Sequence, residues 1–399
     1  MIVKECSNVE KFNYCYGCGV CTKVCSHRLI SMKLVDGFYK PVVKNPSKCT
    51  ECGLCLKSCA FNYNDVMQSA HNIEAYAAWS NDYEVRKICS SGGIGFEIAS
   101  YLLSKGYKVI AVRYNVSNNR AEHYIAETVD QLYDSIGSKY IQSNTEGALK
   151  LINEYDKYLF IGTPCQVDSM KRYVHSRKLT ENFVFVDFFC HGVPSMDFWD
   201  KYVNNVKSNL YGPIKHIFWR NKAEGWHKPF NICIDIDSPA NKSLSIRAFY
   251  NRGLNGRDYL SKNTNGDVFY HFFFKHHCLA PQCTTDCKYK YDSCAADIRI
   301  GDLWGNTYKN NEEGVSGVVA FTSKGSEIIK QLDCITTKPC GIEVVAESQL
   351  KECAKASKES KAVFSLLKHN APYGFIVGYV NTCELMYRII SKIKRMIKI

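Results

Sequence analysis

The sequence predicts an α+β protein: a small cysteine-rich module, then an α/β core, then a mixed β/α C-terminal region. Three observations lead to this prediction. A four-cysteine run occurs twice near the N-terminus, strand-like and helix-like segments alternate from about residue 74 to residue 190, and residues 210–250 show the alternating pattern of strands. A chain of 399 residues also exceeds the size of one compact core. We expect four regions: 1–68, 69–155, 156–340 and a helical tail, 341–399.

The first region carries two copies of the spacing C-x2-C-x2-C-x3-C. In two-cluster ferredoxins, three thiolates of such a run hold one [4Fe–4S] cluster, and the fourth binds the other cluster. The spacing therefore predicts a dicluster, ferredoxin-like module that moves single electrons. The expected ligands of one cluster are Cys15, Cys18, Cys21 and Cys59, and those of the other are Cys49, Cys52, Cys55 and Cys25.

Zinc and disulfide bonds are the alternative uses of these cysteines, and both fit the pattern less well. Zinc sites commonly combine two CxxC pairs across a longer spacer, often with histidine. Disulfides need an oxidising compartment, and nothing at the N-terminus reads as a signal peptide. The 21 cysteines therefore predict metal binding in a reducing cytoplasm. One departure is that Ser26 and Ala60 follow the two runs, where bacterial ferredoxins carry proline.

The other elements follow from local patterns. A hairpin that turns at Asp36-Gly37 separates the two cysteine runs. In the core, buried apolar runs mark strands, and a glycine after an amphipathic stretch marks a helix end. The expected strands are 74–79, 106–113, 123–126, 158–161, 183–189, 232–236 and one that starts at 297, and the expected helices are 94–104 and 146–154.

Four residues before the expected helix 94–104 form a candidate anion site. Unpaired N–H groups and the helix dipole favour a phosphate at a helix N-terminus, and glycine lets the backbone approach closely. A plain helix cap with a flexible turn would explain the same residues. The four residues are Ser90, Ser91, Gly92 and Gly93.

Two loops at strand ends carry candidate redox residues. Thr163 and Pro164 begin a rigid turn at the end of one strand. They are followed by Cys165, a candidate cluster ligand or catalytic redox thiol, and Gln166, whose amide could bind the edge of a planar ring. At the end of the next strand, His191 is a candidate catalytic proton donor. A buried structural role is the alternative for each.

Four further cysteines fall within seventeen residues and suggest a third metal centre, with iron–sulfur favoured. Their spacing is irregular, so any of them could be a spectator that Cys165 or Cys190 replaces. Further on, Trp304 could stack on a flavin and Asp302 could hydrogen-bond it, although a buried turn would also explain both. The four cysteines are Cys278, Cys283, Cys287 and Cys294.

The net charge of +12 is compatible with several kinds of partner and does not distinguish between them. Lysine and arginine are spread along the chain without an RNA-reading motif, so we do not expect nucleic acid as a partner. No run of eighteen apolar residues predicts a transmembrane segment. The tail from Glu384 to Ile399 is typical of a basic amphipathic helix. Such a helix either caps its own domain, which we favour, or makes peripheral contact with an anionic membrane.

Several motifs occur in the order found in one known family. With the doubled cysteine run, they make the chain resemble the beta subunit of coenzyme F-420 hydrogenase/dehydrogenase, in the bacterial branch with an N-terminal double ferredoxin. The resemblance covers about Tyr14 to Gly325. The motifs are SSGG (Ser90–Gly93), GSKYIQS (Gly137–Ser143), GTPCQV (Gly162–Val167), FCHGVPS (Phe189–Ser195), FWRNKAEGW (Phe218–Trp226) and DIRIGDLWG (Asp297–Gly305).

This resemblance implies an iron–sulfur flavoprotein oxidoreductase. The flavin, usually FAD, would lie in the α/β core along the SSGG loop, with residues 162–166 and 191–195 in the same pocket. Electrons would pass between reduced ferredoxin, or a similar carrier, and an organic hydride acceptor, either a deazaflavin coenzyme or a metabolite of polysaccharide synthesis. The alternative is an electron-transfer subunit that docks to a catalytic partner. The resemblance adds Lys139, Tyr140, Gln142 and Ser143 to the flavin-binding residues.

Overall fold

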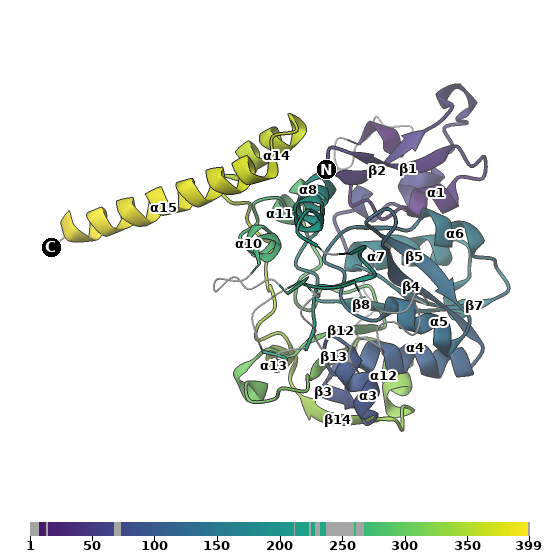
Figure 1. Cartoon of the computed structure of the whole chain (residues 1–399). Coiled ribbons are helices and arrows are strands. Elements are labelled where there is room, and N and C mark those ends of the chain that lie inside the picture. Colours follow the sequence, from purple (N-terminus) through teal and green to yellow (C-terminus); the bar gives the residue numbers. More distant parts are fainter. Residues whose placement is uncertain are drawn as a thin grey trace.

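The computed structural model describes residues 8–12, 15–67, 73–210, 212–222, 225–227, 232–236, 259–260 and 267–397. In Figure 1 the N-terminal module sits above a large twisted sheet, and a long C-terminal helix projects away from the body. The predicted fold class, α+β with a small N-terminal module before an α/β core, is confirmed.

The N-terminal module is a hairpin flanked by two short helices. β1 pairs antiparallel with β2, and the turn lies at Asp36-Gly37 as predicted. Each helix begins directly after a glycine with positive φ, at equivalent places in the two cysteine runs, and these glycines are Gly19 and Gly53. The bounds are α1 Val20–Val24, β1 Ile30–Val35, β2 Phe38–Val43 and α2 Leu54–Lys57, with 3₁₀ turns at Val9–Lys11, Pro46–Lys48 and Ala60–Asn62.

A nine-stranded mixed sheet forms the centre of the protein. Its order is β14-β3-β13-β12-β8-β7-β4-β5-β6, and the central pairs β12/β8, β8/β7 and β7/β4 are parallel. The sheet runs across the boundary expected at residue 155, so regions 69–155 and 156–340 share one layer. The bounds are β3 Glu74–Ser80, β4 Tyr107–Asn115, β5 Arg120–Ala126, β6 Ser143–Asn144, β7 Lys157–Ile161, β8 Phe183–Phe188, β12 Ile298–Asp302, β13 Ser316–Ala320 and β14 Ile335–Cys340.

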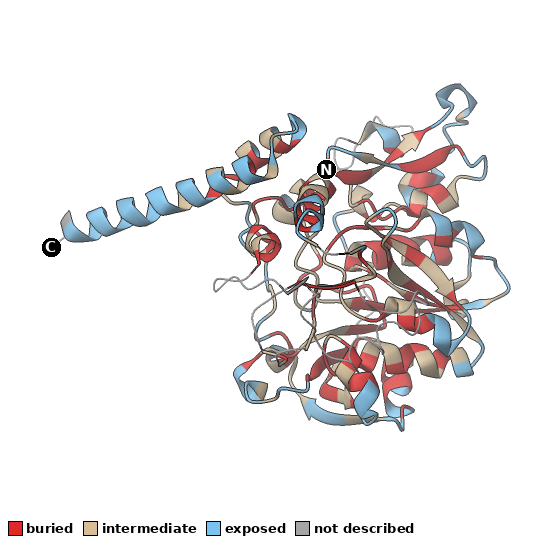
Figure 2. Cartoon of the chain, in the orientation of Figure 1, coloured by how far each residue is buried: buried red, intermediate tan, exposed pale blue. Residues whose placement is uncertain are grey.

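Helices cover both faces of this sheet because its central strands are apolar on both sides (Figure 2). On β8, Val184 and Val186 pack with α4 and α12, whereas Phe183 and Phe185 pack with α7. The helix α4 has the predicted bounds, whereas α3 was not predicted. The bounds are α3 Tyr83–Ile88, α4 Ile94–Ser104, α5 Val129–Leu132, α6 Glu146–Leu151, α7 Pro164–Ser176, α12 Ser323–Lys330 and α13 Ile342–Val345, with 3₁₀ turns at Tyr133–Ser135, Thr180–Asn182 and Asn306–Tyr308.

The remaining helices surround a buried aromatic cluster that includes Trp199, Trp219 and Phe269. A small sheet, β11-β10-β9, contains the predicted strand near residue 234, whereas residues 237–250 of the predicted β-rich segment lie outside the described residues. The bounds are α8 Met196–Lys207, β9 His216–Phe218, β10 Cys233–Asp235, β11 Tyr259–Leu260, α10 Val268–Phe274, α11 Pro281–Thr285, α14 Ser360–Lys368 and α15 Tyr373–Ile397.

The C-terminal helix α15 starts earlier than predicted and has two different halves. Ile376 and Val380 in its first half are buried against the body. From Leu385 to Met396 the side chains are exposed, and this half projects into solvent (Figures 1 and 2). The expectation that the tail caps its own domain is therefore wrong for the second half. Among the described residues, no helix is long and apolar enough to cross a membrane.

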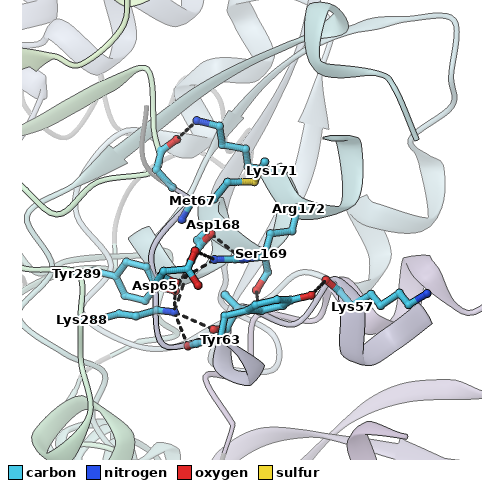
Figure 3. A network of polar contacts seen from close by, with 12 residues as sticks. Lys57, Tyr63, Asp65, Met67, Asp168, Ser169, Lys171, Arg172, Lys288 and Tyr289 are labelled. Atoms are coloured by element: carbon cyan, nitrogen blue, oxygen red, sulfur yellow. Dashed lines mark hydrogen bonds and ion pairs between the residues drawn. The ribbon is translucent and has the colours of Figure 1, made fainter. Parts of the chain in front are cut away.

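A buried carboxylate joins the N-terminal module to the core (Figure 3). Asp168 on α7 is fully buried. Its carboxylate accepts a hydrogen bond from the Tyr289 hydroxyl at 2.8 Å and one from Nε of Arg172 at 3.0 Å. It also accepts the backbone N–H of Met67, at the end of the module, at 3.2 Å.

Lys288 and Arg172 extend this network onto the module. The Arg172 guanidinium lies 4.1 Å from the ring centre of Tyr63, a cation–π contact. Lys288 Nζ lies 3.9 Å from the Asp168 carboxylate. The same Nζ donates to the carbonyl oxygens of Ala60, Tyr63 and Asp65 at 2.9, 2.9 and 2.6 Å.

Replacing Asp168 should loosen the module. The substitution Asp168→Ala leaves buried cations and a buried N–H without their acceptor, which costs about 3–5 kcal/mol. The unfolding midpoint in urea, measured anaerobically, should fall accordingly. Asp65→Asn is the matched control, because the Asp65 side chain is 72% exposed and its ion pair with Arg172 spans 3.6 Å. This control should change stability by less than about 1 kcal/mol. Equal effects of both substitutions would contradict the assignment of Asp168.

Candidate cofactor cavity and cysteine groups

A cavity of about 710 Å³ opens at the edge of the sheet where the parallel strands β7, β8 and β12 end. The residues at these strand ends line it, among them Gly162, Phe189 and Asp302. Ligands of open α/β sheets bind at this edge, because the loops after neighbouring strands diverge there. The volume falls in the range of small-molecule sites.

Eleven of the predicted site residues line this cavity, although they come from five separate segments of the chain. The structure therefore brings most of the predicted residues together, whereas their roles in binding stay predictions. The eleven are Ser90, Ser91, Gly93, Lys139, Tyr140, Ser143, Thr163, Gln166, His191, Asp302 and Trp304.

Four other predicted site residues do not line the cavity. Gly92 packs against the sheet, where a Cβ would lie 2.4 Å from a carbonyl oxygen of β3. Gln142 faces the N-terminal module, and its side-chain oxygen accepts a backbone N–H of β2 at 2.8 Å. Pro164 is the first residue of α7, and Cys165 belongs to a cysteine group described below. The structure therefore does not support direct cofactor contacts by Gly92, Gln142 or Pro164.

The N-terminus of α4 forms one end of the cavity. Gly93 is its N-cap residue with φ 87°, no side chain caps the helix, and Ile94 and Gly95 of the first turn line the cavity. Ser90 Oγ accepts the backbone N–H of Ser138 at 2.9 Å, which joins this loop to the segment that carries Lys139. Free N–H groups at a helix N-terminus suit an anionic group such as a phosphate.

A buried lysine adds charge to the cavity lining. Lys139 Nζ donates to the carbonyl oxygens of Ser135 and Ile136 at 2.6 and 3.1 Å. Burial lowers the pKa of Lys139 to about 7, and the nearby Asp134 opposes this shift. The ammonium group is therefore only partly protonated near neutral pH, and an anion bound beside it would favour the charged form.

Trp304 and Gln166 already have protein partners. Trp304 stacks on Trp226 with ring centres 4.8 Å apart, and the Arg220 guanidinium lies 4.4 Å from its ring centre. Gln166 accepts the Thr163 N–H at 2.9 Å and donates to Ser143 Oγ at 3.2 Å. These contacts hold the cavity walls, and the flavin contacts that the sequence suggested for both residues stay predictions.

His191 is paired with a second histidine. Its Nε2 lies 2.9 Å from Nε2 of His276, whose Nδ1 lies 2.8 Å from the carbonyl oxygen of Lys355. Because a carbonyl only accepts, His276 carries its proton on Nδ1, and its Nε2 accepts the proton of His191. Burial lowers the pKa of His191 to about 3, and His276 and Lys290 add to this shift. His191 is therefore neutral at pH 7.

The first predicted set of cluster ligands lines one small cavity in the N-terminal module. The last cysteine of the second run joins three cysteines of the first run, as predicted. Coordination of an iron–sulfur cluster by these four cysteines stays a prediction. Burial raises the pKa of Cys15 to about 12, and Cys18 adds to the shift. Buried thiolates need a cation beside them, which an iron–sulfur cluster provides. The four are Cys15, Cys18, Cys21 and Cys59.

The second predicted set does not line this cavity. Cys25, Cys49 and Cys55 belong to one apolar cluster of the module, and Cys52 is exposed. The Leu29 N–H points at Cys25 Sγ over 3.4 Å. Hydrogen bonds to sulfur help to set the potential of an iron–sulfur cluster.

Two of the cysteines predicted for a third centre are fully buried in separate parts of the core. Cys278 is fully buried in the aromatic cluster around Trp199. Cys294 is fully buried in a different cluster and donates to the Asp187 carboxylate at 3.4 Å. The two thiols therefore lie in different clusters of the core, which does not support them as ligands of one centre.

Cys165 and Cys190 interact electrostatically with Cys283 and Cys287. Burial raises the pKa of Cys165, and the next causes include the charges of Cys190 and Cys283. Burial also raises the pKa of Cys283, followed by the charges of Cys190 and Cys287. Thiols that influence the pKa of each other in this way belong to one buried region of the protein. The structure thus favours the replacement that the sequence left open.

Sequence reasoning missed two residues that connect these sites. Tyr16 of the module faces the third cysteine group: burial raises its pKa, and the charges of Cys165, Cys287 and Cys283 add to the shift. Lys290 lines the cavity and donates to the carbonyl oxygen of Cys190 at 2.6 Å. Both lie within the cysteine-rich segments, but no local pattern marks them.

Comparisons with known proteins fit this arrangement. A family model for a 4Fe-4S dicluster domain matches residues 14–63. Models for the N-terminal and C-terminal parts of the coenzyme F420 hydrogenase/dehydrogenase beta subunit match residues 75–150 and 155–340. No curated protein matches the chain significantly.

One solved structure similar to this chain is a chain of the F420-reducing [NiFe] hydrogenase complex from Methanosarcina barkeri, in a xenon derivative. It is 18% identical with a TM-score of 0.47, and the alignment covers 77% of this chain and 91% of that chain. The two beta-subunit models together cover about two-thirds of the sequence. The chain therefore belongs to the coenzyme F420 hydrogenase/dehydrogenase beta subunit family and carries an N-terminal 4Fe-4S dicluster domain.

Proposed function

We propose that this protein is a cytoplasmic iron–sulfur flavoprotein oxidoreductase that passes electrons between a reduced ferredoxin-type carrier and an organic hydride acceptor. One observation carries the proposal. Cys190 and His191, which follow β8, line the large cavity, and Cys190 also belongs to the third cysteine group. A one-electron site and a cofactor cavity thus share one loop.

The cavity fits FAD in its chemistry as well as its volume. Its walls are mainly apolar and include the aromatic rings of Phe96, Tyr140 and Phe189. The N-terminus of α4 offers N–H groups for a diphosphate, and Lys139 offers a cation. A bound flavin supplies the ability to take up electrons singly and give them up in pairs as hydride.

We assign a third cluster to Cys165, Cys190, Cys283 and Cys287. A third centre at these four cysteines would lie between the dicluster module and the cavity. A contact between this segment and the module supports the assignment. Gln282, directly before Cys283, donates to the carbonyl oxygen of Cys15 at 2.5 Å. In this assignment Cys165 is a cluster ligand, not the catalytic thiol that the sequence suggested.

His191 and His276 give the cavity a path for protons. Hydride transfer to an organic acceptor is accompanied by proton movement, and two hydrogen-bonded imidazoles pass protons by exchanging tautomers. His276 is partly exposed, so the pair connects the cavity with the protein surface. We propose that the neutral His191 holds and relays this proton.

A second candidate function is that of an electron-transfer subunit without its own substrate. The second half of α15 favours it, because Ile389, Ile393 and Met396 are 48, 49 and 73% exposed there. Arg388, Lys392 and Arg395 are interspersed with these apolar residues. A partner subunit or an anionic membrane could cover this surface.

The proposed function has a direct test. Protein purified without oxygen should release a yellow cofactor on denaturation, and reduced ferredoxin should bleach the flavin absorbance of the intact protein. A colourless supernatant would refute the flavin. Bleaching without turnover of any hydride acceptor, deazaflavin included, would favour the electron-transfer subunit instead.

Iron counts should separate ligands from spectators. Cys190→Ala should remove one cluster and therefore about four of some twelve irons per chain. Cys294→Ala should leave the iron count unchanged, because Cys294 is buried beside Asp187 and lies outside the third group. Iron analysis with low-temperature EPR of the reduced protein measures both. The proposal of a third cluster fails if Cys190→Ala keeps all its iron.

Affinity for FAD should depend on pH through Lys139. The pKa of this lysine is about 7 in the free protein, so affinity should fall as the pH rises above 7 and the ammonium loses its proton. Lys139→Gln should weaken binding roughly tenfold at pH 6.5 and flatten the pH dependence, since a charge-assisted hydrogen bond contributes about 1.5–3 kcal/mol. Quenching of FAD fluorescence on cofactor-stripped protein measures this. The exposed Lys105→Gln is the control, and an unaltered pH profile in Lys139→Gln would exclude the contact.

A further inference from the structure

We propose that His271, His277 and Glu384 form a mononuclear Zn²⁺ site that fastens the base of α15 to the body of the protein. The site is separate from the cysteine groups and independent of the function proposed above. His271 lies on α10, His277 three residues beyond its end, and Glu384 on α15. Among the described residues, their ligand atoms all lie within 4.8 Å of one another.

The distances match a single ion. One oxygen of Glu384 lies 3.0 Å from Nε2 of His271 and 3.4 Å from Nε2 of His277. In a tetrahedral zinc site with bonds of about 2.0–2.1 Å, neighbouring ligand atoms lie roughly 3.3–3.4 Å apart. Two imidazoles and one carboxylate are a donor set that zinc uses with a water in the fourth position.

In the part of the chain that the structure describes, both imidazole nitrogens face the Glu384 carboxylate. Nε2 of His271 and Nε2 of His277 are buried, and neither has a hydrogen-bond partner of acceptable geometry among the described residues. The His277 side chain is 2% exposed, so water does not solvate it freely. Buried polar atoms are rarely left without a partner, and two of them facing one carboxylate oxygen point to a missing cation.

An outer shell orients His277 for metal binding. Its Nδ1 lies 2.8 Å from Ser357 Oγ and 3.5 Å from an oxygen of Glu359. The Glu359 carboxylate is buried and only accepts hydrogen bonds, so it favours a proton on Nδ1 of His277. The lone pair of Nε2 then points toward Glu384. A carboxylate behind a histidine in this way is the usual second shell of a zinc ligand.

Zinc is the preferred ion for these ligands. Nitrogen and oxygen donors bind Zn²⁺ more tightly than Fe²⁺ in the order of first-row metals. Glu384 and His271 are 19 and 24% exposed, which leaves an entry path and room for a water ligand. Bound zinc would connect α10 and the start of α14 to α15. The connection would lie where α15 makes its last contacts with the body of the protein.

Metal analysis of the full chain tests the proposal. Protein purified without oxygen is dialysed against micromolar Zn²⁺, and zinc and iron are counted per chain. We expect one zinc, and its X-ray absorption edge should show only nitrogen and oxygen ligands at about 2.0–2.1 Å. His277→Gln and Glu384→Gln should each lose most of this zinc and keep their iron. His369→Gln, at the end of α14 outside the cluster, should keep both.

Three results would overturn the site: no zinc in the native protein, a sulfur shell at about 2.3 Å, or zinc retained in both variants. Glu384→Gln preserves the size of a partly exposed side chain, so it carries the test if His277→Gln fails to fold. Amide exchange tests the fastening role. Zinc should slow exchange in residues 376–384 of the native protein and leave the Glu384→Gln protein unaffected, and equal exchange with and without zinc would exclude a clamp.

Discussion

The buried carboxylate of Asp168 anchors the end of the dicluster module to the core. It lies on α7, a helix that starts directly after β7 and reaches three sites within two turns. Thr163 at its start lines the cavity, Cys165 belongs to the third cysteine group, and Ser169 accepts the N–H of Ala60, next to Cys59. Sites for electron transfer need fixed separations, and a rigid helix between strand and module provides them.

A second buried ion pair organises the cavity walls. Asp187 on β8 and Arg299 on β12 are both fully buried, and they form two hydrogen bonds of 2.7 Å. The strands that they join end at the loops with Cys190 and with Asp302. Arg299 also donates to the carbonyl oxygen of Tyr291, which lines the cavity. The buried ion pair of Asp187 and Arg299 thus holds the cavity walls. Both charged groups have hydrogen-bond partners, and without such partners a buried ion pair would destabilise the fold.

Local patterns predicted much of this protein, and contacts between distant segments account for the rest. The doubled cysteine spacing predicted the first cysteine group, because the spacing is a known ligand pattern, although Cys59 comes from the second run. The helix α4 has the predicted bounds, because a helix end depends on a few neighbouring residues. The third cysteine group that we propose differs from the predicted one in two members, since its cysteines come from three strand-end and loop segments that only the sheet brings together. Gln142 was misassigned for the same reason: its partner is a strand of the module some hundred residues away.

The turn after α10 shows how the proposed zinc site and the proton path are related. His276 has a left-handed backbone conformation with φ 61°, which is uncommon outside glycine. This conformation sends His276 toward His191 and the cavity, while the adjacent His277 faces Glu384 and α15. A metal ion on His277 would hold this turn in place, and with it the imidazole pair that reaches the cavity. One short segment, His276 and His277, therefore contacts both the base of α15 and the histidine that lines the cavity.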